Sequence, residues 1–420
     1  MDDPAPHRTD RVRRSLGEGG GWSGSSEKAS ALRLRSQPER SFGCSLSRGR
    51  IDAGSRDLAL SRVPAGMKSA MALADFTLVA LQQQLHAAGF NPASALRLLR
   101  CFYERGGEVD WSALNAPRGL RDWVSQRGGL MDTSVAARQA AEDGTQKLLV
   151  RLTDGRTVET VSMPGLRGDR SAGCISSQVG CAMGCDFCAS TQDGFERNLT
   201  PGEMVEQFLH LRREARAGGR RLQTIVFMGM GEPLLNLECV LEAVRRMAAN
   251  ELGALGWRQI TVSTVGVVPG IDALAAANVK INLAVSLHAP DDATRARLLP
   301  AGRRFGVEEI LAAADRFQAR RGRPVSIQYC LLRGVNDSPA QARALAALLA
   351  HRRMHVNLLL YNPTGSSLSG AIYEPSSLAA VQAFLNELHA QRVVAHLRRP
   401  RGRDIDAACG QLRQRTDLHA

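Results

Sequence analysis

After Cys174, strand-like apolar runs alternate with helical segments along the rest of the chain. The runs are TIVFM, ITVS, INLAVSL, VSIQYCLL, VNLLLY and VVAHL. This alternation is typical of parallel strands joined by helical crossovers, which form either an open sheet or a barrel. Because six or so strands only partly close a barrel, the sequence predicts an α/β fold with a partial (β/α)6-type barrel.

Helix signals and polar strand ends support this fold. Thr200-Pro201-Gly202-Glu203 supplies an N-cap, a first-turn proline and the glutamate of a capping box. Further helices are predicted at 270–278, 338–350 and 375–391. Polar or glycine-rich signals follow the strand runs, namely GMGEP, Ser263, His288, Asn336-Asp337 and Asn362. Active sites of such barrels collect at this carboxyl face.

The chain before the barrel divides into three segments. Residues 1–66 are rich in Arg, Ser and Gly without periodic apolar pattern, so we expect disorder, or a leader introduced by gene calling with translation starting at Met67 or Met71. A basic RNA-binding arm is the competing interpretation. Residues 67–130 predict a small N-terminal helical accessory domain. Residues 131–170 predict a linker with a β-hairpin turning at Asp154-Gly155. The barrel with a carboxyl-terminal segment then spans 171–412, and 413–420 form a tail.

Composition narrows the class of protein. The 420 residues carry 54 basic and 41 acidic side chains, a net charge of +13 that suits a polyanionic partner such as RNA. There is no apolar run of about 18 residues and no signal peptide pattern, so we expect a cytoplasmic protein without a membrane partner. Nine cysteines are too sparse for a disulfide scaffold, and clustered ones more often hold metal or do chemistry.

Cys181, Cys185 and Cys188 form a C-x3-C-x2-C cluster in VGCAMGCDFCAS. A zinc site would normally be closed by a fourth Cys or His, and no C-x2-C partner pair exists elsewhere in the chain. Three thiolates suit a [4Fe–4S] cluster that leaves one iron open. A zinc knuckle and buried structural cysteines are the alternatives.

The cysteine cluster resembles that of the radical-SAM superfamily, in which the open iron is chelated by S-adenosylmethionine (SAM) and reductive cleavage of SAM yields a 5′-deoxyadenosyl radical. GMGEP, after a predicted strand, resembles the motif that contacts the methionine amino group. More narrowly, residues 75–415 resemble the RlmN/Cfr family of RNA adenine methyltransferases. The segments that carry this resemblance are CISSQVGCAMGCDFCAS, FMGMGEPLLN, STVGVVPGID, AVSLHAPDD and RGRDIDAACGQL.

This resemblance implies a reaction and three catalytic residues. Two SAM molecules are used: one methylates a cysteine, and the other yields the radical that activates this methyl for addition to an adenine carbon, C2 as first choice and C8 as second. Cys409 is implied as the methyl carrier. Cys174 is implied to resolve the protein–RNA adduct through a transient disulfide, and Glu159 to accept the ring proton. Without the resemblance, Cys409 would be interpreted as a buried small side chain.

The resemblance also implies the SAM contacts, which are Gly231, Glu232, Ser263, Ser286, Leu287, His288 and Asn362. Asn362 is followed by PTGSSLSGAIYEP, which departs from the family's proline-rich loop. LLPAG at 298–302 and YNPTG at 361–365 also depart from the family pattern, and these changes predict an altered RNA target. Cys44, Cys101, Cys239 and Cys330 match no family motif, and we interpret them as structural or incidental.

Two partners follow from this chemistry: structured RNA (rRNA, tRNA or both), and a reductase such as flavodoxin or ferredoxin. Arginines precede Cys409 at 398, 399, 401 and 403, and further basic pairs lie at 220–221 and 352–353. We expect them to contact phosphates and bring an extruded adenine to the thiol. The alternatives are a radical-SAM enzyme acting on a non-RNA substrate and a non-catalytic, zinc-stabilised RNA-binding protein.

Overall fold

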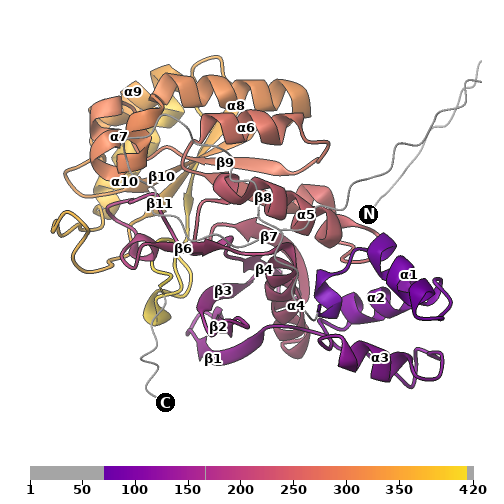
Figure 1. The fold of residues 1–420 in the computed structure, drawn as a ribbon. Coiled ribbons are helices and arrows are strands. Elements are labelled where there is room, and N and C mark those ends of the chain that lie inside the picture. Colours follow the sequence, from indigo (N-terminus) through magenta and orange to yellow (C-terminus); the bar gives the residue numbers. More distant parts are fainter. Residues whose placement is uncertain (1–70, 166, 414–420) are drawn as a thin grey trace, which may run out of the picture. The chain divides into compact units, whose positions relative to one another are not determined.

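A ten-stranded sheet runs through the computed structural model, which describes residues 71–165 and 167–413 (Figure 1). In spatial order its strands are β1 (Ser134–Ala140), β2 (Gln146–Arg151), β3 (Thr157–Pro164), β4 (Arg170–Cys174), β7 (Arg221–Phe227), β8 (Ile260–Thr264), β9 (Asn282–Ser286), β10 (Val325–Leu331), β11 (Met354–Leu360) and β12 (Ala395–Arg398). Pairs from β4 to β12 are parallel, and pairs from β1 to β4 are antiparallel. No pairing joins β1 to β12 within the described ranges.

Helices connect the successive parallel strands. They are α4 (Pro201–Ala217), α5 (Leu237–Ala248), α6 (Val268–Ala276), α7 (Asp292–Leu298), α8 (Val307–Arg321), α9 (Pro339–Leu349) and α10 (Leu378–Ala390). The predicted α/β class with a partial (β/α)6-type barrel is therefore confirmed. The series begins one strand earlier than the apolar runs indicated, because β4 pairs with β7 in parallel.

Helix α4 begins as its sequence predicts. The Thr200 hydroxyl oxygen accepts the Glu203 N–H at 3.2 Å, and the Glu203 carboxylate accepts the Thr200 N–H at 2.8 Å, with Pro201 in the first turn. These bonds satisfy backbone donors that a helix start would otherwise leave unpaired. The predicted capping box is confirmed.

The predicted hairpin is also present, since β2 and β3 pair antiparallel on either side of Gly155, whose φ is +82°. β1, which the sequence analysis did not predict, extends this hairpin to a third strand. A separate pair, β5 (Gln178–Gly180) and β6 (Phe195–Asn198), brackets the cysteine cluster. The hairpin is thus continuous with the main sheet through β3 and β4.

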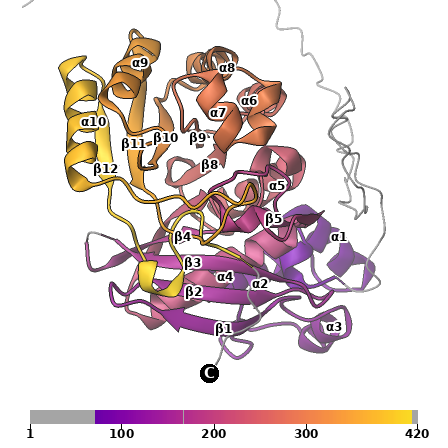
Figure 2. The ribbon, with the colours of Figure 1, turned by 90° about the vertical axis from the view of Figure 1, so that its left-hand side faces the viewer.

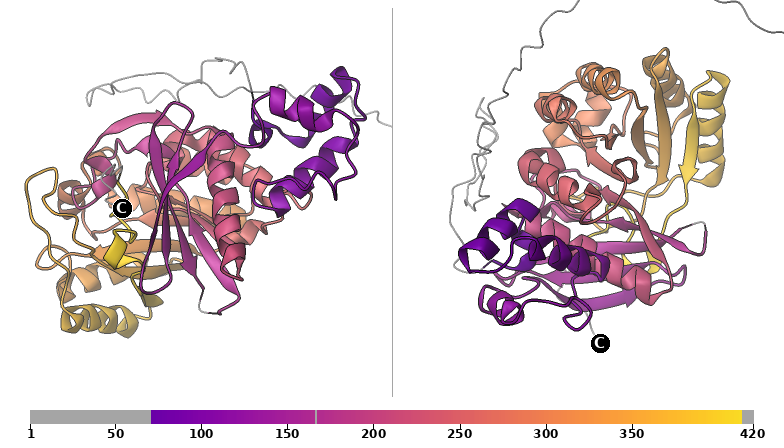
Figure 3. Two further views of the ribbon diagram at one scale, coloured as in Figure 1. Left: turned by 90° about the horizontal axis from the view of Figure 1, so that it is seen from below. Right: turned by 90° about the vertical axis from the view of Figure 1, so that its right-hand side faces the viewer.

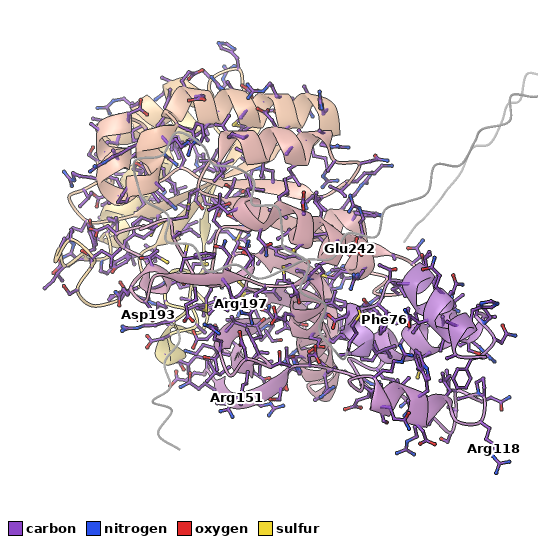
Figure 4. The ribbon with its side chains drawn as sticks, in the orientation of Figure 1. Phe76, Arg118, Arg151, Asp193, Arg197 and Glu242 are labelled. Atoms are coloured by element: carbon purple, nitrogen blue, oxygen red, sulfur yellow. The ribbon has the colours of Figure 1, made fainter. Side chains whose placement is uncertain are left out.

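The N-terminal helices α1 (Leu78–Ala87), α2 (Ser94–Glu104) and α3 (Leu120–Gln126) lie beside α4 (Figures 1 and 3). Arg212 on α4 donates to the Tyr103 carbonyl of α2 at 3.0 Å, and Arg246 on α5 donates at 2.9 Å to the Ala74 carbonyl in the short turn before α1. Arg118 projects outward at the far end of this helical part (Figure 4). Helix α4 is therefore covered by the sheet on one side and by these helices on the other, and most of it is buried.

No helix in residues 71–165 and 167–413 is long and apolar enough to cross a membrane. The predictions for residues 1–66 lie outside the described residues, as does most of the predicted tail, from residue 414 onward.

Arg197 on β6 ties three segments together (Figure 4). Its guanidinium binds both Glu203 oxygens at 2.9 and 2.8 Å, and it donates to Asp154 at the hairpin turn at 2.7 Å. The side chains of Arg197 and Glu203 are 9% and 4% exposed, so this ion pair is largely shielded from water. Loss of one partner would leave a buried charge without compensation.

Arg197→Ala is therefore expected to lower the free energy of unfolding by about 3–5 kcal/mol, because the Glu203 carboxylate stays buried without its partner. Arg343→Ala serves as the control, because the Arg343–Glu387 pair is exposed and its loss should cost about 0–1 kcal/mol. Urea unfolding of the anaerobic protein measures both. Equal effects of the two substitutions would contradict this account of Arg197.

Candidate functional site

The three cysteines of the cluster lie in one loop between β5 and β6. Cys181 follows β5, and its N–H donates to the Gly194 carbonyl at 2.8 Å. A Cβ on Gly180 would lie 1.9 Å from the Gly194 oxygen, so this close approach requires glycine. The Thr191 hydroxyl donates to the Cys188 carbonyl at 3.0 Å. The structure thus folds Cys181, Cys185 and Cys188 into one closed, hydrogen-bonded loop.

All three thiols have a raised pKa. Burial raises the pKa of Cys181 to about 12, and the neighbouring Cys188 raises it further. Burial also raises the pKa of Cys185 and of Cys188. The two other thiols raise the pKa of Cys185 further. Buried thiols ionise only when positive charge compensates them, as bound iron does. The three side chains are close enough to act together and chemically suited to a metal cluster.

The chemistry of the three cysteines suits the predicted cluster. Structural zinc is normally held by four ligands, whereas each thiolate of a [4Fe–4S] cluster binds a different iron and three thiolates leave one iron open.

The predicted SAM residues all lie at carboxyl ends of parallel strands. Gly231 and Glu232 follow β7, Ser263 is the next-to-last residue of β8, and Ser286 ends β9. Leu287 and His288 come directly after Ser286. Asn362 lies two residues beyond the end of β11. Residues far apart in sequence therefore come to the same edge of the sheet, next to the cysteine loop.

Glu232 is buried in the loop after β7. Its oxygens accept the N–H groups of Leu234 at 3.0 Å and Val265 at 2.8 Å. Burial raises its pKa to about 7, and these hydrogen bonds oppose the rise. Gly231 has a φ of +98°, and a Cβ there would lie 2.5 Å from the Gln178 side chain. The carboxylate is therefore held rigidly at the carboxyl end of β7.

His288 has the left-handed backbone conformation, with φ of +61°, which non-glycine residues adopt mainly where function demands it. Its Nδ1 accepts the Cys330 N–H at 2.9 Å, so the proton of the neutral ring lies on Nε2. Burial lowers its pKa to about 3. The ring stands edge-on to Phe187 of the cysteine loop, with centroids 5.1 Å apart. His288 is thus a neutral donor beside the cluster loop.

Asn362 is 5% exposed, and its Oδ1 atom has no hydrogen-bond partner within the described part of the chain. A buried amide oxygen without a partner costs about 1–3 kcal/mol. Such a cost is tolerated where a ligand supplies the missing donor. This atom, together with Glu232 and His288, fits the polar groups of SAM, so the residues present suit the cofactor that the sequence predicts.

The carboxyl-terminal segment (residues 403–413) contacts the cysteine loop. The Gly410 carbonyl accepts the Ala189 N–H at 2.7 Å, and the Leu412 carbonyl accepts the Ser190 hydroxyl at 2.6 Å. Cys409 directly precedes the first of these anchors and is exposed to solvent. Even so, the surrounding protein removes enough solvation to raise its pKa, and the nearby Arg398 opposes the rise.

Cys409 lies close to two other cysteines outside the cluster. Burial raises the pKa of Cys174, and the proximity of Cys409 adds to the rise. The same two causes act on Cys330, which we interpreted as structural or incidental. Cys174 and Cys330 therefore both lie near Cys409, which is 235 residues from Cys174 in the sequence. The resolving role that the resemblance implied for Cys174 stays a prediction.

Glu159 on β3 contacts the carboxyl-terminal segment, which runs past β2 and β3 in Figure 2. Glu159 pairs with Leu149 and Val161 pairs with Cys174, so Glu159 and Cys174 are diagonal neighbours on one face. The Glu159 carboxylate binds the Lys147 ammonium at 3.1 Å and accepts the Arg413 N–H at 2.7 Å. Burial raises its pKa, and Lys147 opposes this rise. The carboxylate is held toward the segment that carries Cys409.

Three groups of residues around the site were not predicted from the sequence. Lys147, which pairs with Glu159, looked like an ordinary strand lysine. Arg295 on α7 is almost fully buried, donates to the Val265 carbonyl and lies near Cys185. The polar run Ser176-Ser177-Gln178 is buried throughout. Only this run had a visible signal, because three polar residues interrupt an apolar stretch directly before the cysteine cluster.

Of the arginines predicted to contact RNA, those near Cys409 and those elsewhere differ in position. Arg398 ends β12, and its positive charge opposes the rise in the pKa of the Cys409 thiol. By contrast, Arg221 begins β7, and Arg352 precedes β11. Arg352 also forms ion pairs with Glu308 and Asp315. The pairs at 220–221 and 352–353 thus lie at the amino ends of parallel strands, away from the carboxyl face.

Comparisons with known proteins show which proteins the chain resembles. Residues 175–346 match the Radical SAM superfamily. The chain is 66% identical over 341 residues to the probable dual-specificity RNA methyltransferase RlmN 1 of Opitutus terrae, covering 81% of this chain and 96% of that protein. It is 40% identical over 339 residues to the dual-specificity RNA methyltransferase RlmN of Syntrophobacter fumaroxidans, covering 80% and 96%. A crystal structure of a radical SAM methyltransferase from Sphaerobacter thermophilus superposes with a TM-score of 0.77 at 43% identity, covering 82% and 99%.

Cys181→Ala is expected to remove the brown colour and most of the iron from anaerobically reconstituted protein, because only two thiolates remain for the cluster. Cys101→Ala, on α2 and outside the cysteine loop, is the matched control and should keep both. Absorbance near the visible iron–sulfur band and iron content per chain measure the result. Full iron content in Cys181→Ala would refute the assignment.

Proposed function

Because the chain belongs to the RlmN family of dual-specificity RNA methyltransferases, we propose that it methylates a ring carbon of adenine in structured RNA. C2 is the expected position, with C8 as the second choice, and the substrate is rRNA, tRNA or both. The observation that supports this most directly is the convergence of Cys409, Cys174 and Glu159 beside the cysteine loop. A radical enzyme acting on a small molecule has no need of this arrangement.

When bound, a [4Fe–4S] cluster and two molecules of SAM supply a methyl group and a radical that removes hydrogen. Cys181, Cys185 and Cys188 would hold the cluster. Gly231, Glu232, Ser263, Ser286, Leu287, His288 and Asn362 would hold SAM. The exposure of Cys409 allows its sulfur to accept the methyl and then to meet an RNA base, since both must reach it from outside the barrel core.

Glu159 and Cys174 would release the methylated base. The Glu159 carboxylate takes the proton from the adenine ring carbon, for which it must be ionised, and the Lys147 ammonium favours that state. The Cys174 thiolate then attacks the Cys409 sulfur, so that a disulfide forms and the carbon–sulfur bond to RNA breaks. The electron pair of that bond stays on the released carbon, which takes up a proton to become the methyl group, and an external thiol reductant must reduce the disulfide before the next turnover. That Glu159 and Cys174 share one sheet face supports the proposal that both act on the same side of the adduct.

RNA would approach from the side of the carboxyl-terminal segment. Arg398, Arg399 and Arg403 are exposed there and could contact phosphates around an extruded adenine. The N-terminal helices would add recognition of RNA shape. An external one-electron donor such as flavodoxin or ferredoxin is required, and we expect the enzyme to act in the cytoplasm, where RNA and such donors occur.

Two cysteine substitutions separate the proposed steps. Cys409→Ala is expected to abolish RNA methylation, because no sulfur remains to carry the methyl. Cys174→Ala is expected to form the carbon–carbon bond but to accumulate protein cross-linked to RNA, because no thiol resolves the adduct. Denaturing gels detect the cross-link, and nucleoside mass spectrometry distinguishes C2 from C8 methylation.

Nucleosides of total RNA from a deletion strain and its parent then identify the product made in cells. Cys101→Ala should methylate RNA as the wild type does. Wild-type methylation by Cys409→Ala would rule out the carrier role, and clean turnover by Cys174→Ala would remove Cys174 from the pathway.

Lys147→Met is expected to shift the acid limb of the pH–rate profile for adduct release to higher pH. The ammonium lowers the pKa of Glu159, so its loss raises that pKa, and a base that must be ionised then needs a higher pH. Lys147→Arg keeps the positive charge and should keep the profile. An unchanged acid limb in Lys147→Met would show that Glu159 is not the base.

A further inference from the structure

A cleft of about 930 Å³ lies against the outer side of the cysteine loop. We call it the basic cleft, and the residues that define it are Gly184, Asp186, Arg297, Arg303, Leu368 and Ile372. They come from the cysteine loop, from the chain after β9 and from the loop after β11. The last of these is the loop in which the sequence departs from the family pattern.

The basic cleft reaches the cysteine loop at the position of a cluster ligand. Gly184 and Asp186 are the two chain neighbours of Cys185. The Asp186 carboxylate accepts the Ser369 N–H at 2.8 Å, the Ser369 hydroxyl at 2.7 Å and the Tyr373 hydroxyl at 2.6 Å. These bonds fasten the loop after β11 to the cysteine loop. A protein bound in the cleft would therefore touch the chain next to the cluster.

Positive charge exceeds negative charge in the cleft, whose lining holds three arginines and two carboxylates. Arg297 and Arg303 are exposed, and no carboxylate of the described residues forms an ion pair with either. Glu374 binds Arg333 at 2.6 Å, whereas Asp186 keeps its negative charge while it accepts hydrogen bonds from Ser369 and Tyr373. The unpaired charges favour an acidic partner and would speed its association at low salt.

Apolar side chains stand beside these arginines. Leu368 is 53% exposed and Ile372 is 79% exposed, and both lie on the small loop after β11 that is closed by the Ser366–Ile372 bridge. Large exposed apolar side chains ringed by charge are typical of protein-binding surfaces. A nucleic acid backbone would leave them in water, whereas an acidic protein with an apolar contact edge would cover them.

The cleft is separate from the RNA-reactive side. None of its lining residues belongs to the carboxyl-terminal segment or to β1, β2 and β3. Cys409 is anchored through Ala189 and Ser190, at the other end of the cysteine loop from Gly184. The carboxyl-terminal segment also meets the loop after β11, where Gln411 donates to the Pro363 carbonyl at 3.2 Å, but neither of these residues lines the cleft.

We propose that the basic cleft docks the electron donor, a small acidic flavodoxin-type protein whose redox group has an apolar exposed edge. This inference rests on the proposed function, because only a radical-SAM enzyme needs such a donor. The reduced flavin of the donor loses one electron, and the cluster held by the three cysteines gains it, with no bond made or broken. The rate of electron transfer falls steeply with distance, so a docking site next to Cys185 is favourable. Weak complexes between redox partners use small interfaces of this kind.

The test compares two double variants of the full-length reconstituted enzyme. Arg297→Glu/Arg303→Glu reverses the charge of the basic cleft. Arg258→Glu/Lys280→Glu changes the net charge equally but lies before β8 and β9, at the opposite ends of the strands. Binding of oxidised flavodoxin is measured by surface plasmon resonance at low and high salt. SAM cleavage and RNA methylation are measured with reduced flavodoxin and, separately, with dithionite, which needs no docking site.

We expect the cleft variant to bind flavodoxin at least about tenfold more weakly at low salt, with a smaller salt dependence, and the control to bind as the wild type does. Activity with flavodoxin should fall in parallel while activity with dithionite is unchanged. Ile372→Ser should weaken flavodoxin binding without changing its salt dependence.

Wild-type flavodoxin binding by the cleft variant would overturn the proposal. Weaker RNA binding with intact flavodoxin binding would assign the cleft to RNA and also overturn it. If the wild type fails to cleave SAM with dithionite as the reductant, the proposed function itself is refuted.

Discussion

The hydrogen bonds of one buried polar segment determine how the parts of this site meet. The Ser176 hydroxyl donates to the Glu159 carbonyl at 2.7 Å and accepts the Met230 N–H at 2.9 Å, while the Gln178 side chain accepts the Glu232 N–H at 2.8 Å. Because buried polar groups must be paired, neither β3 nor the loop after β7 can move without leaving one unsatisfied. The same segment therefore positions the proposed base and the proposed SAM loop relative to the cysteines that follow it.

These hydrogen bonds, together with those of the carboxyl-terminal segment and of Asp186, hold the cysteine loop in place for the two proposed partners. Its beginning is fixed by the segment at 176–178, its end is bound by the carboxyl-terminal segment, and its outer side is fastened by Asp186 to the loop after β11. A loop held at three places keeps its geometry when a macromolecule binds to one of its sides. If RNA reacts at Cys409 and an electron donor docks near Cys185, as proposed, substitutions in the loop after β11 would alter docking without altering the chemistry at Cys409.

Features with local signals could be predicted from the sequence. The apolar runs predicted β7 to β12, and Thr200 and Glu203 predicted the start of α4, because strand burial and helix capping are read from neighbouring residues. β1 and β4 could not be predicted in this way. β1 has no buried residue, and in β4 the neighbouring side chains of Leu211 and Ile225 fill the space over Gly173, so neither strand needs an apolar pattern of its own.

The site shows the same division between local and distant information. The spacing of Cys181, Cys185 and Cys188 predicts a metal cluster because its ligands lie within one loop. Cys409 and Glu159 carried no local signal, and only the family resemblance identified them. Their meeting depends on the register of β2, β3 and β4, which places Glu159 and Cys174 on one face, and on anchors that are far away in sequence. A lone cysteine or a strand glutamate acquires its chemistry from what the fold brings beside it, and the ammonium of Lys147 and the thiol of Cys174 are two such neighbours.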